Sequence, residues 1–110
     1  MHIISIVPDR LINRHIKSFL ERDYKICTSF NYHVDPNRLV HFEILLIHIS
    51  WKTVKKAASI VSYFESKRRP VLILSTEAPS SFMELRSKQL IWLEIPFVES
   101  ALKAMIEDHL

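Results

Sequence analysis

Three polar side chains that could do chemistry follow three apolar stretches of the chain. Asp9 comes shortly after residues 3–7, His48 ends residues 43–48, and Ser75 follows residues 71–74. A carboxylate can hold a hard cation such as Mg²⁺, and an imidazole can ligate a metal, accept a phosphoryl group or change charge near neutral pH. A hydroxyl can hydrogen-bond an anion. These residues predict a polar site, provided that the fold brings the ends of the three stretches together.

The apolar stretches themselves predict strands, because they are short, rich in Val, Ile and Leu, and bounded by turn residues. Buried strands are expected at residues 3–7, 43–49, 71–74 and 90–93, and an alternating edge strand at residues 24–30. Apolar residues at helical spacing predict helices at 12–21, 53–69 and 98–106, with shorter ones at 37–42 and 80–88. Strands and helices therefore alternate along the chain.

This alternation predicts a parallel sheet covered on both faces, a three-layer α/β/α sandwich. Right-handed crossovers favour the flavodoxin-like strand order 2-1-3-4-5. In such a sheet the ligand crevice lies outside the carboxyl ends of the strands, between the first and the third. That rule selects Pro8 and Asp9 after the first strand, His48 at the end of the third, and Ser75 after the fourth.

Length and composition place the chain among ordinary globular proteins. Its 110 residues suit a single domain spanning residues 1–110, with 48% apolar and 25% charged residues and a net charge of +3. No apolar run approaches the roughly 18 residues of a membrane span, and Pro8 and Asp9 interrupt the first one, unlike a signal peptide. We therefore expect a cytoplasmic protein without a membrane partner.

The amino acids that the chain lacks exclude several classes of function. Glycine is absent, so the chain has no P-loop, no Gly-rich dinucleotide turn and no Gly-x-Ser-x-Gly elbow. Cys27 is the only cysteine, which excludes an internal disulfide and a multi-cysteine zinc site. Its place in an apolar strand predicts a buried structural thiol. Most nucleotide-binding and hydrolase functions that depend on those motifs are thereby removed.

Three segments carry a resemblance to a known family. Residues 70–76 are Pro-Val-Leu-Ile-Leu-Ser-Thr, residues 92–97 are Trp-Leu-Glu-Ile-Pro-Phe, and residues 4–10 are Ile-Ser-Ile-Val-Pro-Asp-Arg. They resemble the fourth strand with its terminal hydroxyl, the fifth strand running into Lys-Pro-Phe, and the first strand with its acidic cluster in the CheY-like receiver domains of two-component response regulators. Over the whole chain, the resemblance implies the receiver fold.

The same resemblance implies that the family's phosphoryl chemistry is degenerate here. Receivers use an acidic pair to hold Mg²⁺, a nucleophilic aspartate, a hydroxyl and a lysine. At the corresponding positions this chain has Pro8 beside Asp9, then His48, Ser75 and Ile95. Only the hydroxyl and one carboxylate remain. The resemblance therefore implies a pseudo-receiver that is not an enzyme, needs no metal or cofactor, and acts independently of phosphorylation.

A receiver without that chemistry would keep its interaction surface, which in the family is built from the fourth helix, fifth strand and fifth helix. The corresponding residues here include Glu84, Trp92, Glu94 and Lys103. We expect such a module to form a homodimer or to control a linked effector domain in transcription. Because the chain ends soon after its last helix, we also expect it to be one domain of a larger protein. DNA would then be contacted only through the effector. Trp92 is either a partner anchor or ordinary packing.

Two alternatives remain open at this level. Asp9, His48 or Ser75 could still accept a phosphoryl group in an unusual way, whereas a neutral His48 hydrogen-bonded to Asp9 or to backbone would be inert. The basic third helix could also bind nucleic acid, or its charges could simply be solvated. The charges in question are Lys52, Lys55, Lys56 and the run 67–69.

Overall fold

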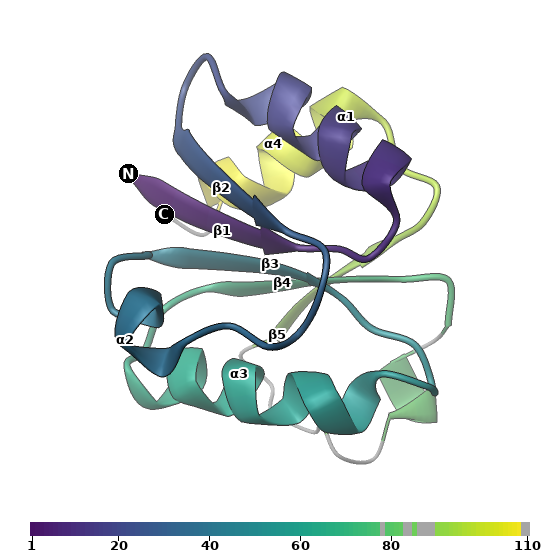
Figure 1. The fold of residues 1–110 in the computed structure, drawn as a ribbon. Helices are drawn as coiled ribbons and strands as arrows, with labels where there is room; N and C mark the ends of the chain where they lie inside the picture. The colour runs from purple at the N-terminus through teal and green to yellow at the C-terminus, as the bar shows by residue number, and fades with distance from the viewer. Residues whose placement is uncertain (78, 83–84, 86–89, 109–110) are drawn as a thin grey trace.

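A parallel five-stranded sheet forms the centre of the molecule, and helices cover both of its faces (Figure 1). The computed structural model describes residues 1–77, 79–82, 85 and 90–108. Its elements, in chain order, are β1 (His2–Ile6), α1 (Arg10–Leu20), β2 (Lys25–Ser29), α2 (Pro36–Leu39), β3 (Ile44–His48), α3 (Val54–Ser66), β4 (Val71–Ser75), the 3-10 helix η1 (Pro79–Ser81), β5 (Leu90–Glu94) and α4 (Glu99–Asp108).

The strand order is β2-β1-β3-β4-β5 and every pairing is parallel, which confirms the predicted flavodoxin-like topology. Helices α1 and α4 lie on one face of the sheet, and α2 and α3 lie on the other (Figure 1). The edge position predicted for residues 24–30 is also confirmed, since β2 pairs only with β1. None of the helices in the described ranges is long and apolar enough to span a membrane.

Burial on both faces explains why the central strands are almost continuously apolar. Successive residues of a strand point to opposite faces, so Ile3 packs in the core under α1 and α4, while Ile4 packs in the core under α3. Leu45 and Leu46 of β3 divide in the same way. Each helix then contributes one apolar stripe, with Ile16 on α1 and Phe64 on α3 fully buried.

The structure corrects two details of the sequence-based prediction. Cys27 is only half-buried, because it lies on the edge strand, and the Arg38 guanidinium donates to its sulfur at 3.5 Å. The helix predicted at residues 80–88 is replaced, where the chain is described, by the short η1. Phe82 and Leu85 are buried but not helical, and the rest of that stretch lies outside the described residues.

The end of α3 shows how a chain without glycine reverses after a helix. Arg68 adopts a φ of 54°, a left-handed conformation that glycine usually supplies. The next residue, Arg69, turns toward α2, where its guanidinium donates to the carbonyls of Leu39, Val40 and Phe42. Part of the basic run 67–69 thus holds two helices together instead of facing an outside partner.

Candidate functional site

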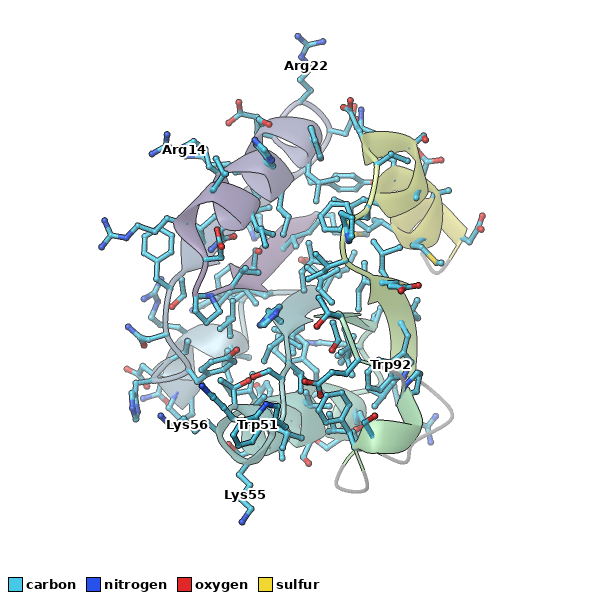
Figure 2. The ribbon with its side chains drawn as sticks, turned by 90° about the vertical axis from the view of Figure 1, so that its right-hand side faces the viewer. Arg14, Arg22, Trp51, Lys55, Lys56 and Trp92 are labelled. Atoms are coloured by element: carbon cyan, nitrogen blue, oxygen red, sulfur yellow. The ribbon has the colours of Figure 1, made fainter. Side chains whose placement is uncertain are left out.

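The carboxyl ends of the strands gather the residues that the topology rule selected. Beyond the paired strands, the Ile49 N–H donates to the Leu74 carbonyl and the Ile95 N–H donates to the Ser75 carbonyl, both at 3.0 Å. These bonds extend the sheet at the edge where His48 and Ser75 lie. Figure 2 views the molecule from this edge, with Trp51 and Trp92 at its rim. The predicted site residues therefore share one end of the fold, although their roles differ.

Asp9 acts as the N-cap of α1. Its Oδ1 accepts a hydrogen bond from the Ile12 N–H at 3.0 Å, which satisfies one of the free amides at the start of the helix. Asp9 and its neighbour Pro8 are exposed. The Asp9 carboxylate thus stabilises the start of α1. Within the described ranges, no group of three His, Cys, Asp or Glu side chains could hold a metal ion.

His48 is half-buried at the end of β3, and its ring Nδ1 is buried without a hydrogen-bond partner in the described part of the chain. In the described part of the chain, this nitrogen therefore makes no hydrogen bond to Asp9 or to the backbone. Burial lowers the pKa of His48, and the charges of Asp9 and Glu77 oppose this effect without reversing it. The site thus favours an uncharged imidazole.

Sequence reasoning missed Tyr32, which completes the end of β3. Its hydroxyl donates a hydrogen bond to the His48 carbonyl at 2.5 Å, and burial raises the pKa of the phenol. Tyr32 comes from the loop between β2 and α2, sixteen residues before His48 in the chain. A tyrosine in a polar loop carries no local signal for such a contact, because the contact depends on the β2-β1-β3 strand order.

Sequence reasoning also missed Asn13 and Ser5, a buried polar pair beneath α1. Both side chains are fully buried, and the Ser5 hydroxyl donates to Asn13 Oδ1 at 2.7 Å. The Asn13 amide donates to the Val7 and Ser29 carbonyls at 3.3 and 3.1 Å, and at 3.5 Å to the Ser5 carbonyl. The sequence signal that could have found this pair is the polar Asn13 on the apolar, inner face of α1. The pair fixes α1 against the ends of β1 and β2.

Ser75 and Ile95 occupy the remaining receiver-like positions. Ser75 is buried at 2% exposure, and its Oγ accepts a hydrogen bond from the Glu77 N–H at 3.0 Å. Ile95 packs with the core under α1 and α4, and the Ile95–Pro96 peptide is cis. The apolar side chain of Ile95 supplies no charge that could bind an anion. Ser75 therefore offers a hydroxyl at this edge and His48 an imidazole, but Ile95 offers no cation.

A groove of about 410 Å³ opens beside Ser75 and includes part of the predicted interaction surface. It is lined by Ser75, Thr76, Glu77, Pro79, Trp92, Leu93 and Glu94. Trp92 forms one wall and stacks on Phe82, with ring centroids 5.8 Å apart and planes 13° apart. Trp92 is therefore a packed, half-buried residue, which agrees with the packing interpretation, and its role as a partner anchor stays a prediction.

Of the other two residues of the predicted surface, Lys103 does not line this groove. Lys103 on α4 is engaged in ion pairs with Glu99 at 3.1 Å and Asp23 at 3.9 Å. Glu84 lies outside the described residues. Among the described residues of the predicted surface, Trp92 and Glu94 line the groove together, and Glu77 joins them, so that the groove carries two carboxylates.

Solved structures with the same fold include several response regulators. Chemotaxis response regulator CheY4 of Vibrio cholerae matches with a TM-score of 0.81 at 16% identity, covering 99% of this chain and 98% of that one. A two-component response regulator from Clostridium difficile gives a TM-score of 0.78 at 16% identity, covering 99% and 94%.

A response regulator receiver domain protein from Clostridium thermocellum gives 0.78 at 14% identity, covering 98% and 92%. No protein-family model matches the sequence, and no curated protein matches it. At these identities the likeness is one of fold. The chain has the five-stranded fold of a CheY-like receiver domain.

Proposed function

We propose that this chain, which has the receiver fold, is a signalling module that binds partner proteins and does not accept a phosphoryl group at the family's usual position. It would act as a homodimer or by controlling an effector, in keeping with a role in transcription. It would not be an enzyme, and it would need neither metal nor cofactor.

The observation that carries this proposal is the state of His48. A phosphoryl acceptor at the end of β3 must be reachable, and Mg²⁺ must neutralise the charge that develops during transfer. Here the imidazole is half-buried and held uncharged, and the nearby Asp9 carboxylate caps α1. An apolar Ile95 stands where a lysine would pair with the phosphoryl oxygens. These features together oppose phosphoryl transfer.

The groove beside β5 supports the binding part of the proposal. Glu77 and Glu94 place two carboxylates around a cavity with Trp92 as its wall. An aromatic face next to carboxylates suits a basic side chain, which gains both a cation–π contact and an ion pair. We therefore propose a partner segment that presents a Lys or Arg to this groove.

Intact-mass spectrometry after incubation with acetyl phosphate and Mg²⁺ tests the central statement. The expected result is an unchanged mass over a time in which an active receiver is fully modified in parallel. A mass increase of one phosphoryl group would refute the proposal. Repeating the measurement on Asp9→Asn, His48→Gln and Ser75→Ala would then identify the acceptor.

Light scattering and pull-down assays test the surface. Glu94→Lys and Trp92→Leu should weaken self-association or capture of a linked effector, whereas Trp51→Leu, on another part of the same edge, should not (Figure 2). Glu94 is exposed, so the charge reversal should leave the fold intact. Association that is unchanged by both groove variants would place the partner elsewhere.

One observation favours nucleic-acid binding as a second candidate. Trp51 is 71% exposed in the loop before α3, and Lys52 Nζ lies 5.3 Å from the centroid of its ring. Lys55 and Lys56 follow on the exposed side of α3. An indole could stack on a base while lysines contact phosphates. Binding of single-stranded DNA that weakens steeply with salt and is lost in Trp51→Ala would support this candidate.

A further inference from the structure

A second, basic pocket lies on the opposite side of the sheet from α3. It has a volume of about 240 Å³ and opens between α1 and the end of β2. Its lining consists of Arg10, Asn13, Arg14, Lys17, Thr28 and Phe30. None of these residues belongs to the groove beside β5 or to the Trp51 loop. The pocket is therefore independent of the function proposed above.

The charges around this pocket are all positive. Arg10, Arg14 and Lys17 are exposed, and their spacing of four and three residues places them on one side of α1. Within the described residues none of the three forms an ion pair with a carboxylate. Like charges at this spacing repel one another and slightly destabilise the helix. An anion in the pocket would relieve that repulsion and satisfy several donors at once.

The other residues that line the pocket suit an organic anion better than a simple inorganic anion. Phe30 is 45% exposed, and the Arg10 guanidinium carbon lies 5.1 Å from the centroid of its ring. Thr28 is half-buried, and no hydrogen bond of its hydroxyl occurs in the part of the chain that is described. Asn13 forms the floor, and backbone carbonyls already occupy its amide. The pocket thus offers cations, one free hydroxyl and an aromatic face.

We propose that this pocket binds a nucleotide unit, a phosphate ester attached to a planar base. Arg14 and Lys17 would hold the phosphate, and the base would pack on Phe30 beside Arg10. Side chains must supply these contacts, because a chain without glycine has no Gly-rich loop to surround a phosphate. Stacking on an aromatic ring with nearby Arg is the usual recognition of bases by side chains.

Titration of the ¹⁵N-labelled protein, followed by amide chemical shifts at low ionic strength, tests this proposal. AMP should shift the amides of Thr28, Phe30 and residues 10–17 at lower concentrations than inorganic phosphate does, and adenosine should bind more weakly than AMP. A short oligothymidylate in a separate arm distinguishes free nucleotide from nucleic acid as the source. A tetra-aspartate peptide that shifts the same amides as strongly as AMP would overturn the proposal.

Matched double variants test whether AMP binds in this pocket or through non-specific electrostatic attraction to the protein. The double variant Arg14→Ala/Lys17→Ala should weaken AMP binding by about tenfold or more, because two charge-assisted contacts are lost. Lys55→Ala/Lys56→Ala removes the same charge from α3, in the opposite layer, and should leave the affinity within about twofold. Phe30→Leu should weaken AMP but not phosphate. Equal losses in both double variants, or no shifts at all, would overturn the proposal.

Discussion

The hydroxyl of Tyr32 donates a hydrogen bond to the backbone carbonyl of His48, and so ties the loop after β2 to the end of β3. The two segments are separated by β1 in the sheet, and no strand pairing connects them. This bond satisfies a carbonyl at the point where β3 ends and the chain turns toward α3.

Tyr32→Phe should lower the free energy of unfolding by about 1–2 kcal/mol, because it leaves a half-buried carbonyl without its donor. Denaturant unfolding followed by circular dichroism measures this change. Tyr63→Phe is the matched control, since the Tyr63 hydroxyl makes no hydrogen bond in the described part of the chain and its ring contacts Phe64 and Lys67. Equal effects of the two variants would contradict a specific role for Tyr32.

His48 should make stability depend on pH. Burial lowers the pKa of His48 in the folded protein, so the unfolded chain, with a value of about 6.5, binds the proton more tightly. The stability from the neutral ring is fully present above about pH 6.5 and is lost as the pH falls toward the folded value. His48→Gln should remove this dependence.

The measurement is the difference in unfolding free energy between wild type and His48→Gln as a function of pH. The other five histidines are the same in both proteins and cancel in the difference. The difference should be constant above about pH 7 and should shift in favour of the variant below about pH 6.5. A difference that does not change with pH would rule out a lowered pKa.

Asn13 should be the most sensitive polar position in the core. Asn13→Ala removes an amide that donates to backbone carbonyls of β1, the following residue and β2, and should cost about 2–4 kcal/mol. Ser5→Ala removes one hydroxyl from the same pair and should cost about 1 kcal/mol. Thermal or denaturant unfolding would show this order, and a larger cost for Ser5 would contradict it.

Arg69 should contribute to stability although it belongs to a basic run. Arg69→Ala leaves the carbonyls of Leu39, Val40 and Phe42 without their charged donor, and should lower the unfolding free energy by about 1–3 kcal/mol. Arg22→Ala is the control, because Arg22 is exposed and extends away from the body of the molecule (Figure 2). If Arg69 binds an outside anion instead of these carbonyls, both variants should have the same free energy of unfolding.

Most of the fold could be predicted because its signals are local. The run at β4 predicts a strand through its short length and its Val, Ile and Leu content, and the stripe that places Val61 and Phe64 on one side of α3 predicts a helix through its period. Parallel pairing and right-handed crossovers then leave few strand orders. The stretch at residues 80–88 carries a weak pattern, and the helix expected there was wrong where the chain is described, since Phe82 and Leu85 are buried outside any helix.

The site was predicted only in part, because only some of its features carry a local signal in the sequence. The topology rule placed His48 and Ser75 at the correct edge, because the carboxyl ends of parallel strands must lie together. It could not place Glu77 beside Glu94 in one groove, since that depends on how the chain turns after β4. Nor could it show that Lys103, which the family resemblance assigns to the interaction surface, forms ion pairs with Glu99 and Asp23.

The sequence by itself determined the class of fold and which residues stand at the ends of its strands. Strand and helix periods follow from side-chain hydrophobicity, and the identities of His48 and Ile95 need no coordinates. Only the tertiary structure decided that the His48 ring nitrogen is buried without a partner among the described residues, that Tyr32 bonds to the His48 carbonyl, and that α1 forms a basic pocket with β2. Burial and hydrogen bonding between distant segments are properties of the assembled layers, which no local pattern specifies.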